Sequence, residues 1–235
     1  MVSEIANNIM IARERIAGAA ARAGRKPEDI ALVAVSKTRT VEEMIEAARC
    51  GVDALGENRV QEALDKYEAW PGEHAVPWHM VGHLQRNKAR KAWDVFRCIH
   101  SIDSVRLASA LQSLSEEKGS AIRILVEVNA GEDPAKHGVK LREAESVMES
   151  IVSECPGLDI AGLMTVAPLD AAEGSARKTF AVLRETRDAL EKKLGLSLPH
   201  LSMGMSGDFV DAILEGSTMV RIGTAIFGKR HMKGA

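Results

Sequence analysis

Short runs of apolar residues recur along the chain, and each is followed by a longer segment of mixed polarity. The first run, from Ala31 to Val35, holds only small or branched apolar residues and leads into Ser36 and Lys37. An uninterrupted apolar run of this length is typical of a parallel strand buried on both faces. This run and similar ones predict strands at about 31–36, 53–56, 78–82, 98–102, 122–128, 160–164, 200–203 and 219–222.

The segments between these strands carry apolar residues at helical spacing. Before the first strand, apolar residues recur every three or four positions with charged residues between them, which predicts an amphipathic helix over about 3–23. The sequence from Thr40 to Glu43 forms a capping box, a common start of a helix. Further helices are predicted at about 40–49, 60–68, 87–95, 105–118, 142–153, 174–194 and 208–215.

The regular alternation of strand and helix predicts the fold class. Strands joined through helices run parallel, because each helical crossover returns the chain to the same edge of the sheet. Eight such units fit a closed (β/α)₈ barrel of the TIM type better than an open sheet. We expect a single domain over residues 1–235, with the barrel at about 30–229 and the first helix as an addition to it.

Composition narrows the class of protein. Apolar residues make up 46% of the chain and charged residues 27%, as in globular proteins. The net charge of -2 argues against nucleic acid or a membrane surface as a partner, and no apolar run is long enough to span a membrane. The cysteines, Cys50, Cys98 and Cys155, lie far apart and fit reduced thiols. We therefore expect a cytoplasmic protein.

The carboxyl ends of the barrel strands are where active sites lie in this fold. The first strand delivers Lys37 to that end. A lysine amine can form a Schiff base with a carbonyl compound, and burial favours its neutral, nucleophilic form. A loop lysine that simply reaches solvent is the alternative, and the spacing alone does not exclude it.

The loops after the last two strands predict an anion site. Barrels often hold a phosphate between these loops, at the start of a short helix. Ser206 is a good residue to cap the helix that follows, and Gly207 allows an anion to approach backbone amides. Gly223 and Thr224 offer the same chemistry after the eighth strand. Each could have a purely structural role, but together they predict a phosphate cup.

Lysine and cup together predict a ligand that carries both an aldehyde and a phosphate. Pyridoxal 5'-phosphate (PLP) is such a molecule, and Arg221 would then point into the barrel mouth. An arginine against the pyridine nitrogen donates a hydrogen bond and keeps that nitrogen unprotonated, which weakens the ring as an electron sink. Two alternatives remain: Arg221 could form a structural ion pair, and the lysine and cup could belong to a sugar-phosphate enzyme.

Several motifs resemble those of one family. They are VSKTRT, GENRVQE, WHMVGHLQRNK, HSIDS, GLMTVAP and LSMGMSGDFVDAILEGSTMVRIGTAIFG, and they cover about 33–228. In this order they resemble the pyridoxal-phosphate homeostasis proteins, also called YggS or PROSC proteins. The resemblance implies a barrel like the N-terminal domain of alanine racemase, without the second domain of that enzyme. It implies PLP as a Schiff base on Lys37, with Ser206, Gly223 and Thr224 on the phosphate and Arg221 on the ring nitrogen.

The resemblance also implies a function without a defined catalytic turnover. Such proteins buffer or deliver PLP within vitamin B6 homeostasis, and apo forms of PLP-dependent enzymes are expected recipients. We expect Asn58, His83 and Met164 to contribute to the PLP site as well. We expect no metal site, because His79 and His83 are four residues apart without a recognisable third ligand.

A PLP-dependent amino-acid racemase is the main alternative function. Two-base racemisation needs a second acid or base on the opposite face of the ring. The only tyrosine, Tyr67, is predicted on an outer helix, which leaves Asp208 or His83 as substitutes. In alanine racemase the second base is a tyrosine from the other domain, across a dimer. Because this chain has no such domain to share, we expect a monomer.

Overall fold

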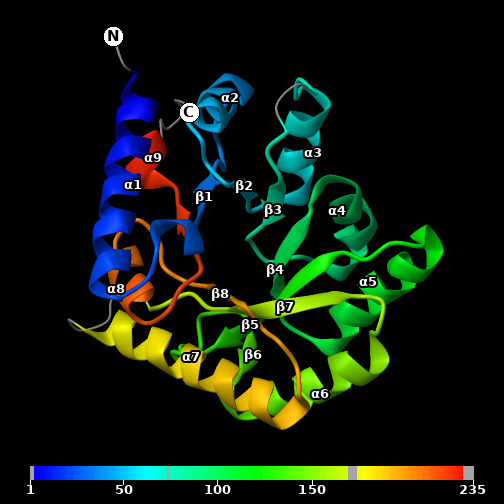
Figure 1. Ribbon diagram of the computed structural model, residues 1–235. Coiled ribbons are helices and arrows are strands. Elements are labelled where there is room, and N and C mark those ends of the chain that lie inside the picture. Colours follow the sequence, from blue (N-terminus) through cyan, green and yellow to red (C-terminus); the bar gives the residue numbers. More distant parts are fainter. Residues whose placement is uncertain (1–2, 73–74, 169–173, 230–235) are drawn as a thin grey trace.

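Parallel strands close into a barrel in the computed structural model, which describes residues 3–72, 75–168 and 174–229 (Figure 1). The barrel strands are β1 (Ala31–Val35), β2 (Ala54–Glu57), β3 (Trp78–Met80), β4 (Cys98–Ile102), β5 (Arg123–Asn129), β7 (Asp159–Met164), β8 (His200–Ser202) and β9 (Met219–Ile222). They are ordered β4-β3-β2-β1-β9-β8-β7-β5, and a further pairing of β4 with β5 closes the ring. The predicted eight-stranded barrel is confirmed.

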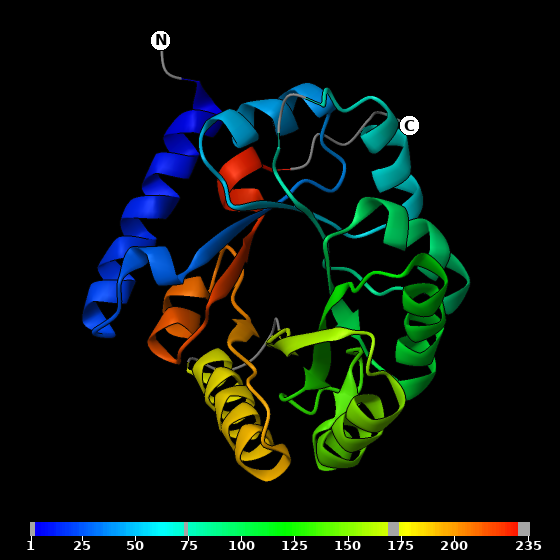
Figure 2. The ribbon, with the colours of Figure 1, turned by 45° about the vertical axis from the view of Figure 1, so that its right-hand side comes forward.

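Helices surround the strands as an outer ring (Figure 2). They are α1 (Glu4–Arg22), α2 (Val41–Arg49), α3 (Val60–Glu68), α4 (Ala89–Val95), α5 (Val105–Lys118), α6 (Ala144–Glu154), α7 (Ser175–Leu194), α8 (Phe209–Leu214) and α9 (Thr224–Phe227). The added helix α1 packs along α8, α9 and α2. The predicted capping box is present, because Thr40 Oγ1 accepts from the Glu43 amide and Glu43 Oε2 accepts from the Thr40 amide.

Two apolar layers hold the barrel together. Successive side chains of a strand point to opposite faces, so Leu32 and Ala34 of β1 pack against the helices while Val33 points into the barrel. The small interior layer also contains Ala54, Cys98, Leu125, Ala161, Met164 and Met219. Because both faces of the strands are buried, their sequences are almost continuously apolar.

The strand register places three strand ends beside one another. Val33 of β1 pairs with Ala54 of β2 on one side and with Arg221 of β9 on the other. Residues that follow β1, β2 and β9 therefore emerge at neighbouring points on the carboxyl rim. This juxtaposition creates the candidate site.

The structure differs from the sequence prediction in several short elements. β6 (Val139–Lys140) pairs with the end of β5 outside the barrel, where a loop was predicted. The 3₁₀ turns η2 (Arg86–Lys88) and η3 (Leu141–Glu143) precede α4 and α6, so these helices begin later than predicted. η1 (Pro27–Asp29) leads into β1. Within the described parts of the chain, no helix combines the length and the apolar character needed to cross a membrane.

Candidate functional site

A pocket opens at the carboxyl end of the barrel strands. Its lining contains most of the predicted site residues, brought together from four strand ends. The lining residues are Val35, Lys37, Asn58, Val81, Lys136, Val166, Met205, Ser206, Gly207, Arg221, Gly223 and Thr224. The residues predicted at the ends of β1, β2, β8 and β9 therefore share one cavity.

Lys37 lies in a tight loop that is held on both sides. The Ser36 amide donates to the Gly56 carbonyl at 2.9 Å, and Ser36 Oγ donates to Glu57 Oε1 at 2.7 Å. On the other side, the Thr38 amide donates to Glu62 Oε1 at 2.5 Å. Thr38 has a φ of 65°, a left-handed conformation that is rare for a β-branched residue. Such a conformation persists only where its surroundings impose it, so the direction in which Lys37 leaves the strand is fixed.

The acceptors around Lys37 belong to a buried ion network centred on Lys66 of α3. Lys66 Nζ donates to Glu57 Oε1 at 2.7 Å, to Glu62 Oε1 at 2.7 Å and to the Ser36 carbonyl at 2.8 Å. Glu57 is fully buried, and burial raises the pKa of its carboxyl although Lys66 opposes this rise. The sequence pattern does not identify Lys66, because its role follows from the packing of α3 behind the β1 strand end.

The loops after β8 and β9, which the sequence predicts to form a phosphate cup, lie side by side at the pocket. Ser206 Oγ accepts from the Ala225 amide of α9 at 3.2 Å, so it binds across to the neighbouring loop. The expectation that Ser206 caps the helix after it was wrong, because Asp208 is the N-cap of α8 and its Oδ1 accepts from the Met205 amide at 2.6 Å. A Cβ added at Gly207 would meet no atom within 4 Å, which leaves the backbone there open to a ligand.

The Arg221 side chain reaches the pocket from the barrel interior. Its Nη1 donates to Ser202 Oγ at 2.6 Å and its Nη2 donates to the Thr165 carbonyl at 2.8 Å. Burial lowers the pKa of Arg221 to about 10, while Glu127 and Asp208 favour the charged form. Arg221 is therefore still a cation at neutral pH, anchored by a hydroxyl and a carbonyl oxygen.

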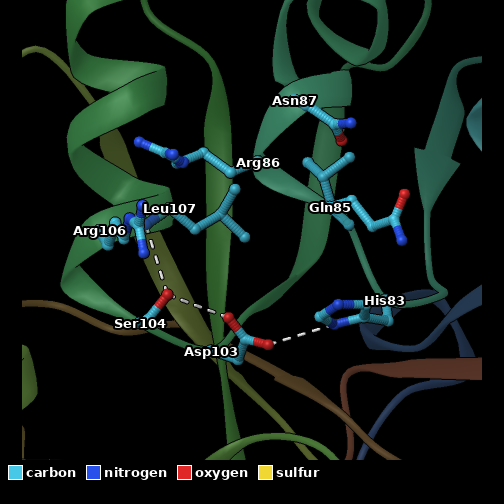
Figure 3. Close-up of a pocket in the computed structure, with 9 residues that line it drawn as sticks. His83, Gln85, Arg86, Asn87, Asp103, Ser104, Arg106 and Leu107 are labelled. Carbon is cyan, nitrogen blue, oxygen red and sulfur yellow. Dashed lines mark hydrogen bonds and ion pairs between the residues drawn. The ribbon is translucent and has the colours of Figure 1, made fainter.

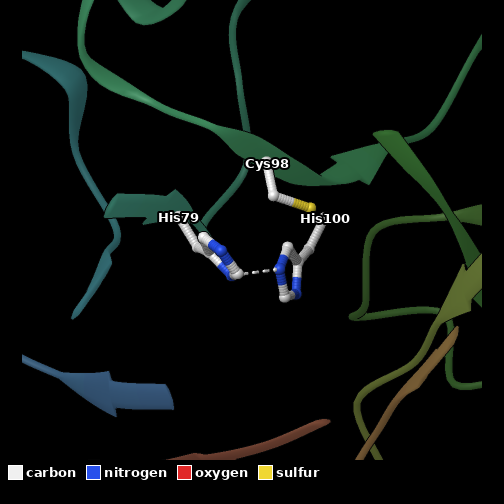
Figure 4. A group of neighbouring side chains, drawn as sticks. All are labelled: His79, Cys98 and His100. Atoms are coloured by element: carbon white, nitrogen blue, oxygen red, sulfur yellow. Dashed lines mark hydrogen bonds between the residues drawn. The ribbon is translucent and has the colours of Figure 1, made fainter. Parts of the chain in front are cut away.

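A chain of hydrogen bonds continues from Arg221 into the barrel. Ser202 Oγ lies 2.8 Å from His100 Nδ1. His100 Nε2 lies 3.0 Å from His79 Nδ1 (Figure 4). Burial lowers the pKa of His79 to about 4 and that of His100 well below its usual value. Both imidazoles are therefore neutral at physiological pH. The positive charge of the neighbouring Arg221 also disfavours a proton on His100.

Two predicted site residues do not line this pocket. Met164 is buried in the interior layer of the barrel, in the same apolar cluster as Val33. His83 lines a separate cavity with Asp103, and its Nδ1 lies 3.2 Å from Asp103 Oδ2 (Figure 3). The residues after β3 and β7 that do line the pocket are Val81 and Val166. Both follow directly or closely after the last residue of their strands, which would have identified them from the sequence. Lys136 comes from the β5–β6 loop, where the sequence shows no periodic pattern.

Comparisons with known proteins agree with this arrangement. The family described as the alanine racemase N-terminal domain matches residues 4–231. A pyridoxal phosphate homeostasis protein of Aquifex aeolicus is 42% identical over 217 residues, with 92% of this chain and 94% of that protein covered. The protein of the same name from Escherichia coli K12 is 38% identical over 234 residues, which cover 97% of this chain and 98% of that protein.

A solved structure of this type resembles the whole chain. It is PipY of Synechococcus elongatus PCC7942 with PLP bound, which is 34% identical and superposes with a TM-score of 0.85. The match covers 95% of this chain and 100% of PipY. On fold, family model and relatives together, this chain belongs to the pyridoxal phosphate homeostasis protein family, whose barrel is the alanine racemase N-terminal domain.

Proposed function

We propose that this protein binds PLP in the pocket at the barrel mouth and carries or buffers it for intracellular vitamin B6 homeostasis. The observation that carries the proposal is the sharing of one pocket by Lys37 and the loops around Ser206 and Gly223. An amine and an anion cup in one cavity suit a ligand with an aldehyde and a phosphate. The names of the relatives and the PLP bound to PipY support the same ligand.

The pocket residues divide between the functional groups of PLP. Lys37 is proposed to form a Schiff base with the aldehyde, with release of one water, and Asn58 lies on the same wall. Ser206, Gly207, Gly223 and Thr224 are proposed to hold the phosphate through hydroxyl and amide groups. The sequence also predicts that His83 and Met164 contribute to the PLP site, but their positions outside the pocket lining support no direct contact.

The charge of Arg221 suits a protein that stores PLP better than one that catalyses a reaction on it. When bound, PLP supplies an electrophilic aldehyde and a pyridine ring that can withdraw electrons. The Arg221 guanidinium donates hydrogen bonds and carries a charge, so it disfavours a proton on a ring nitrogen placed against it. An unprotonated ring withdraws electrons weakly. We infer that a defined catalytic turnover is not the main role of this protein.

The racemase alternative finds little support in the lining of the pocket. Tyr67 lies on α3, where its ring packs against Trp78, and neither Asp208 nor His83 lines the cavity. Apart from Lys37 and Arg221, Lys136 is the one titratable side chain among the described lining residues. Among these described lining residues, Lys136 is the one candidate for a second base.

We extend the proposal to the setting in which the protein works. We propose that residues 1–235 act as one PLP-binding domain and as a monomer in the cytoplasm. Apo forms of PLP-dependent enzymes are proposed as recipients of the cofactor. A net charge of -2 gives no general attraction to nucleic acid or to a membrane surface, and we propose neither as a partner.

The visible absorption spectrum tests this proposal. With PLP added, the wild type is expected to show a yellow band that Lys37→Ala shifts or loses, whereas Lys140→Ala, with an exposed lysine, keeps it. Borohydride reduction and peptide mass spectrometry then identify the modified lysine. Label on Lys37 supports the proposal, and label on Lys136 alone contradicts the assignment of the Schiff base.

Two further results would redirect the function. A wild type that stays colourless after PLP is added would contradict PLP binding and favour a sugar-phosphate enzyme. Steady racemisation of an amino acid by the wild type, abolished in Lys37→Ala, would contradict the carrier role and establish the racemase.

A further inference from the structure

Three loops at the barrel mouth bring two imidazoles and a carboxylate together, outside the pocket proposed for PLP. His83 follows β3, Asp103 follows β4, and His137 lies in the β5–β6 loop. Each offers one ligand atom, and these atoms all lie within 4.8 Å of one another. The cluster is accessible, because His83 and His137 are exposed and Asp103 is half-buried.

The spacing within the cluster fits a metal ion. His83 Nδ1 and Asp103 Oδ2 are 3.2 Å apart. Two ligands on zinc, with bonds of about 2.0–2.1 Å and tetrahedral angles, lie about 3.4 Å from each other. The His83 and His137 rings are stacked, with centroids 4.3 Å apart and an interplanar angle of 14°. Because the two ring planes are nearly parallel, the exposed His137 side chain must rotate before its nitrogen lone pair points to a metal held by His83 and Asp103.

The carboxylate is also held in place by a neighbouring residue. Ser104 Oγ donates to Asp103 Oδ1 at 3.1 Å, on the oxygen that does not face His83 (Figure 3). Ser104 is itself fixed as the N-cap of α5, where its Oγ accepts from the Leu107 amide at 3.3 Å. Hydrogen bonds of this kind orient the ligands of known metal sites.

A second cluster of potential metal ligands lies inside the barrel and is less suited to a metal ion. His79, Cys98 and His100 are also within 4.8 Å of one another, but all three are buried in the barrel. A cation there would face the charge of Arg221 through Ser202, and burial raises the pKa of the Cys98 thiol to about 12. The cluster at the barrel mouth is therefore the better candidate for a metal site.

We propose that His83, Asp103 and His137 bind a divalent first-row transition metal such as Zn²⁺. Two imidazole nitrogens and one carboxylate oxygen suit zinc, nickel, cobalt or ferrous iron, whereas magnesium and calcium prefer oxygen ligands alone. Three protein ligands leave the remaining positions to water or to an incoming ligand. His137 adjoins Lys136, so the metal would also fix the loop that lines the rim of the proposed PLP pocket.

The sequence spacing predicts no metal site, because His79 and His83 are four residues apart without a recognisable third ligand. In the structure these two side chains point in different directions. His79 points to His100 inside the barrel, and His83 turns outward to Asp103. The other ligands come from distant strand ends, which the linear sequence does not bring together.

Isothermal titration calorimetry with Zn²⁺ tests the site on full-length, untagged protein that has been stripped of metal with a chelator. We expect one Zn²⁺ per chain in the wild type and at least tenfold weaker binding in His83→Gln and His137→Gln. His200→Gln is the matched control, because His200 begins β8 at the opposite end of the barrel, and it should bind like the wild type.

Asp103→Asn keeps the proposal testable if a histidine variant unfolds in thermal melts. It preserves the size of the side chain but removes the charge, and we expect at least tenfold weaker binding. A Co²⁺ absorption spectrum provides a second measurement, with visible bands in the wild type that Asp103→Asn and His137→Gln lose. Absence of saturable Zn²⁺ binding in the wild type overturns the proposal, and so does unchanged affinity in all three ligand variants.

Discussion

The backbone of Gly82 lies against that of Asn58, one of the residues that line the pocket. A Cβ at residue 82 would be 2.4 Å from the Asn58 carbonyl oxygen and 2.7 Å from its Cα. On its other side, the Gly82 carbonyl accepts from Ser101 Oγ at 2.6 Å. Glycine is therefore required here for close approach of two chain segments, and it sets the position of Asn58.

This contact predicts a large effect from a single methyl group. Gly82→Ala should destabilise the protein by about 1–3 kcal/mol, the usual cost of forcing an atom into a packed region. It should also weaken PLP binding, because the Asn58 backbone must move. Chemical denaturation and a PLP titration measure the two effects.

Gly18→Ala is the matched control for this substitution. Gly18 lies within α1, and a Cβ there would meet no atom within 4 Å. Alanine in a helix interior is more favourable than glycine by about 0.5–1 kcal/mol, so this variant should be more stable than the wild type. Equal midpoints for Gly82→Ala and the wild type would contradict the close approach seen in the structure.

The loop between β1 and α2 depends on a different element, the helix α3. Lys66 reaches from α3 to the Ser36 carbonyl and to the carboxylates of Glu57 and Glu62. Its side chain is 10% exposed and that of Glu57 is fully buried. The loop that carries Lys37 therefore rests on a helix that itself contributes no residue to the pocket lining.

Removal of the Lys66 charge tests this dependence. Lys66→Met leaves Glu57 buried without its cation, which should cost about 3–5 kcal/mol in the free energy of unfolding. The double variant with Glu57→Gln should recover most of the loss, because no buried charge remains without a partner. PLP absorption measured beside the denaturation curves reports whether the Lys37 loop keeps its shape.

Lys118→Met provides a comparison on a more exposed ion pair. Lys118 Nζ lies 2.6 Å from Asp94 Oδ1, and the two side chains are 31% and 55% exposed. Pairs of this kind contribute about 0–1 kcal/mol, so the variant should unfold nearly like the wild type. If Lys66→Met is no more destabilised than Lys118→Met, the network does not support the loop.

Sequence patterns predict the elements of this fold well where both faces of a strand are buried. The apolar run of β1 identifies the strand, and its end identifies Lys37. The same periodicity places Arg221 and Gly223 on one strand end. β6 is only two residues long, too short for any period to show. Contacts across loops are likewise invisible in sequence, which is why the Ser206 bond to Ala225 and the position of Lys136 were missed.

Across the whole barrel, the interior holds several ionisable groups that titrate far from their usual pH. Burial raises the pKa of Glu127 on β5 to about 7, although Arg221 opposes this rise. Burial lowers the pKa of His79 on β3 to about 4. Burial therefore favours the neutral form of both groups, and both make the stability of the fold depend on pH.

The two dependences have opposite signs. Between pH 4.5 and about 7, Glu127 is protonated in the native state but ionised in the unfolded chain, so its contribution to stability falls as pH rises. Between pH 6.5 and about 4, His79 is neutral in the native state but protonated in the unfolded chain, so its contribution falls as pH falls. His100 acts in the same direction as His79.

Replacing each group by glutamine should separate these contributions. The stability of Glu127→Gln relative to the wild type should increase by about 3 kcal/mol between pH 4.5 and pH 8, because the wild type alone must ionise a buried carboxyl. For His79→Gln the relative stability should change in the opposite direction, improving by about 2.5 kcal/mol as pH falls from 8 to 4.5. Urea denaturation of the three proteins at both pH values measures the two differences. Because the variants are compared with the wild type at each pH, contributions from groups that do not interact with the replaced residue cancel. Differences that stay constant with pH, or that change in the same direction for both variants, would contradict a barrel interior that keeps both Glu127 and His79 neutral.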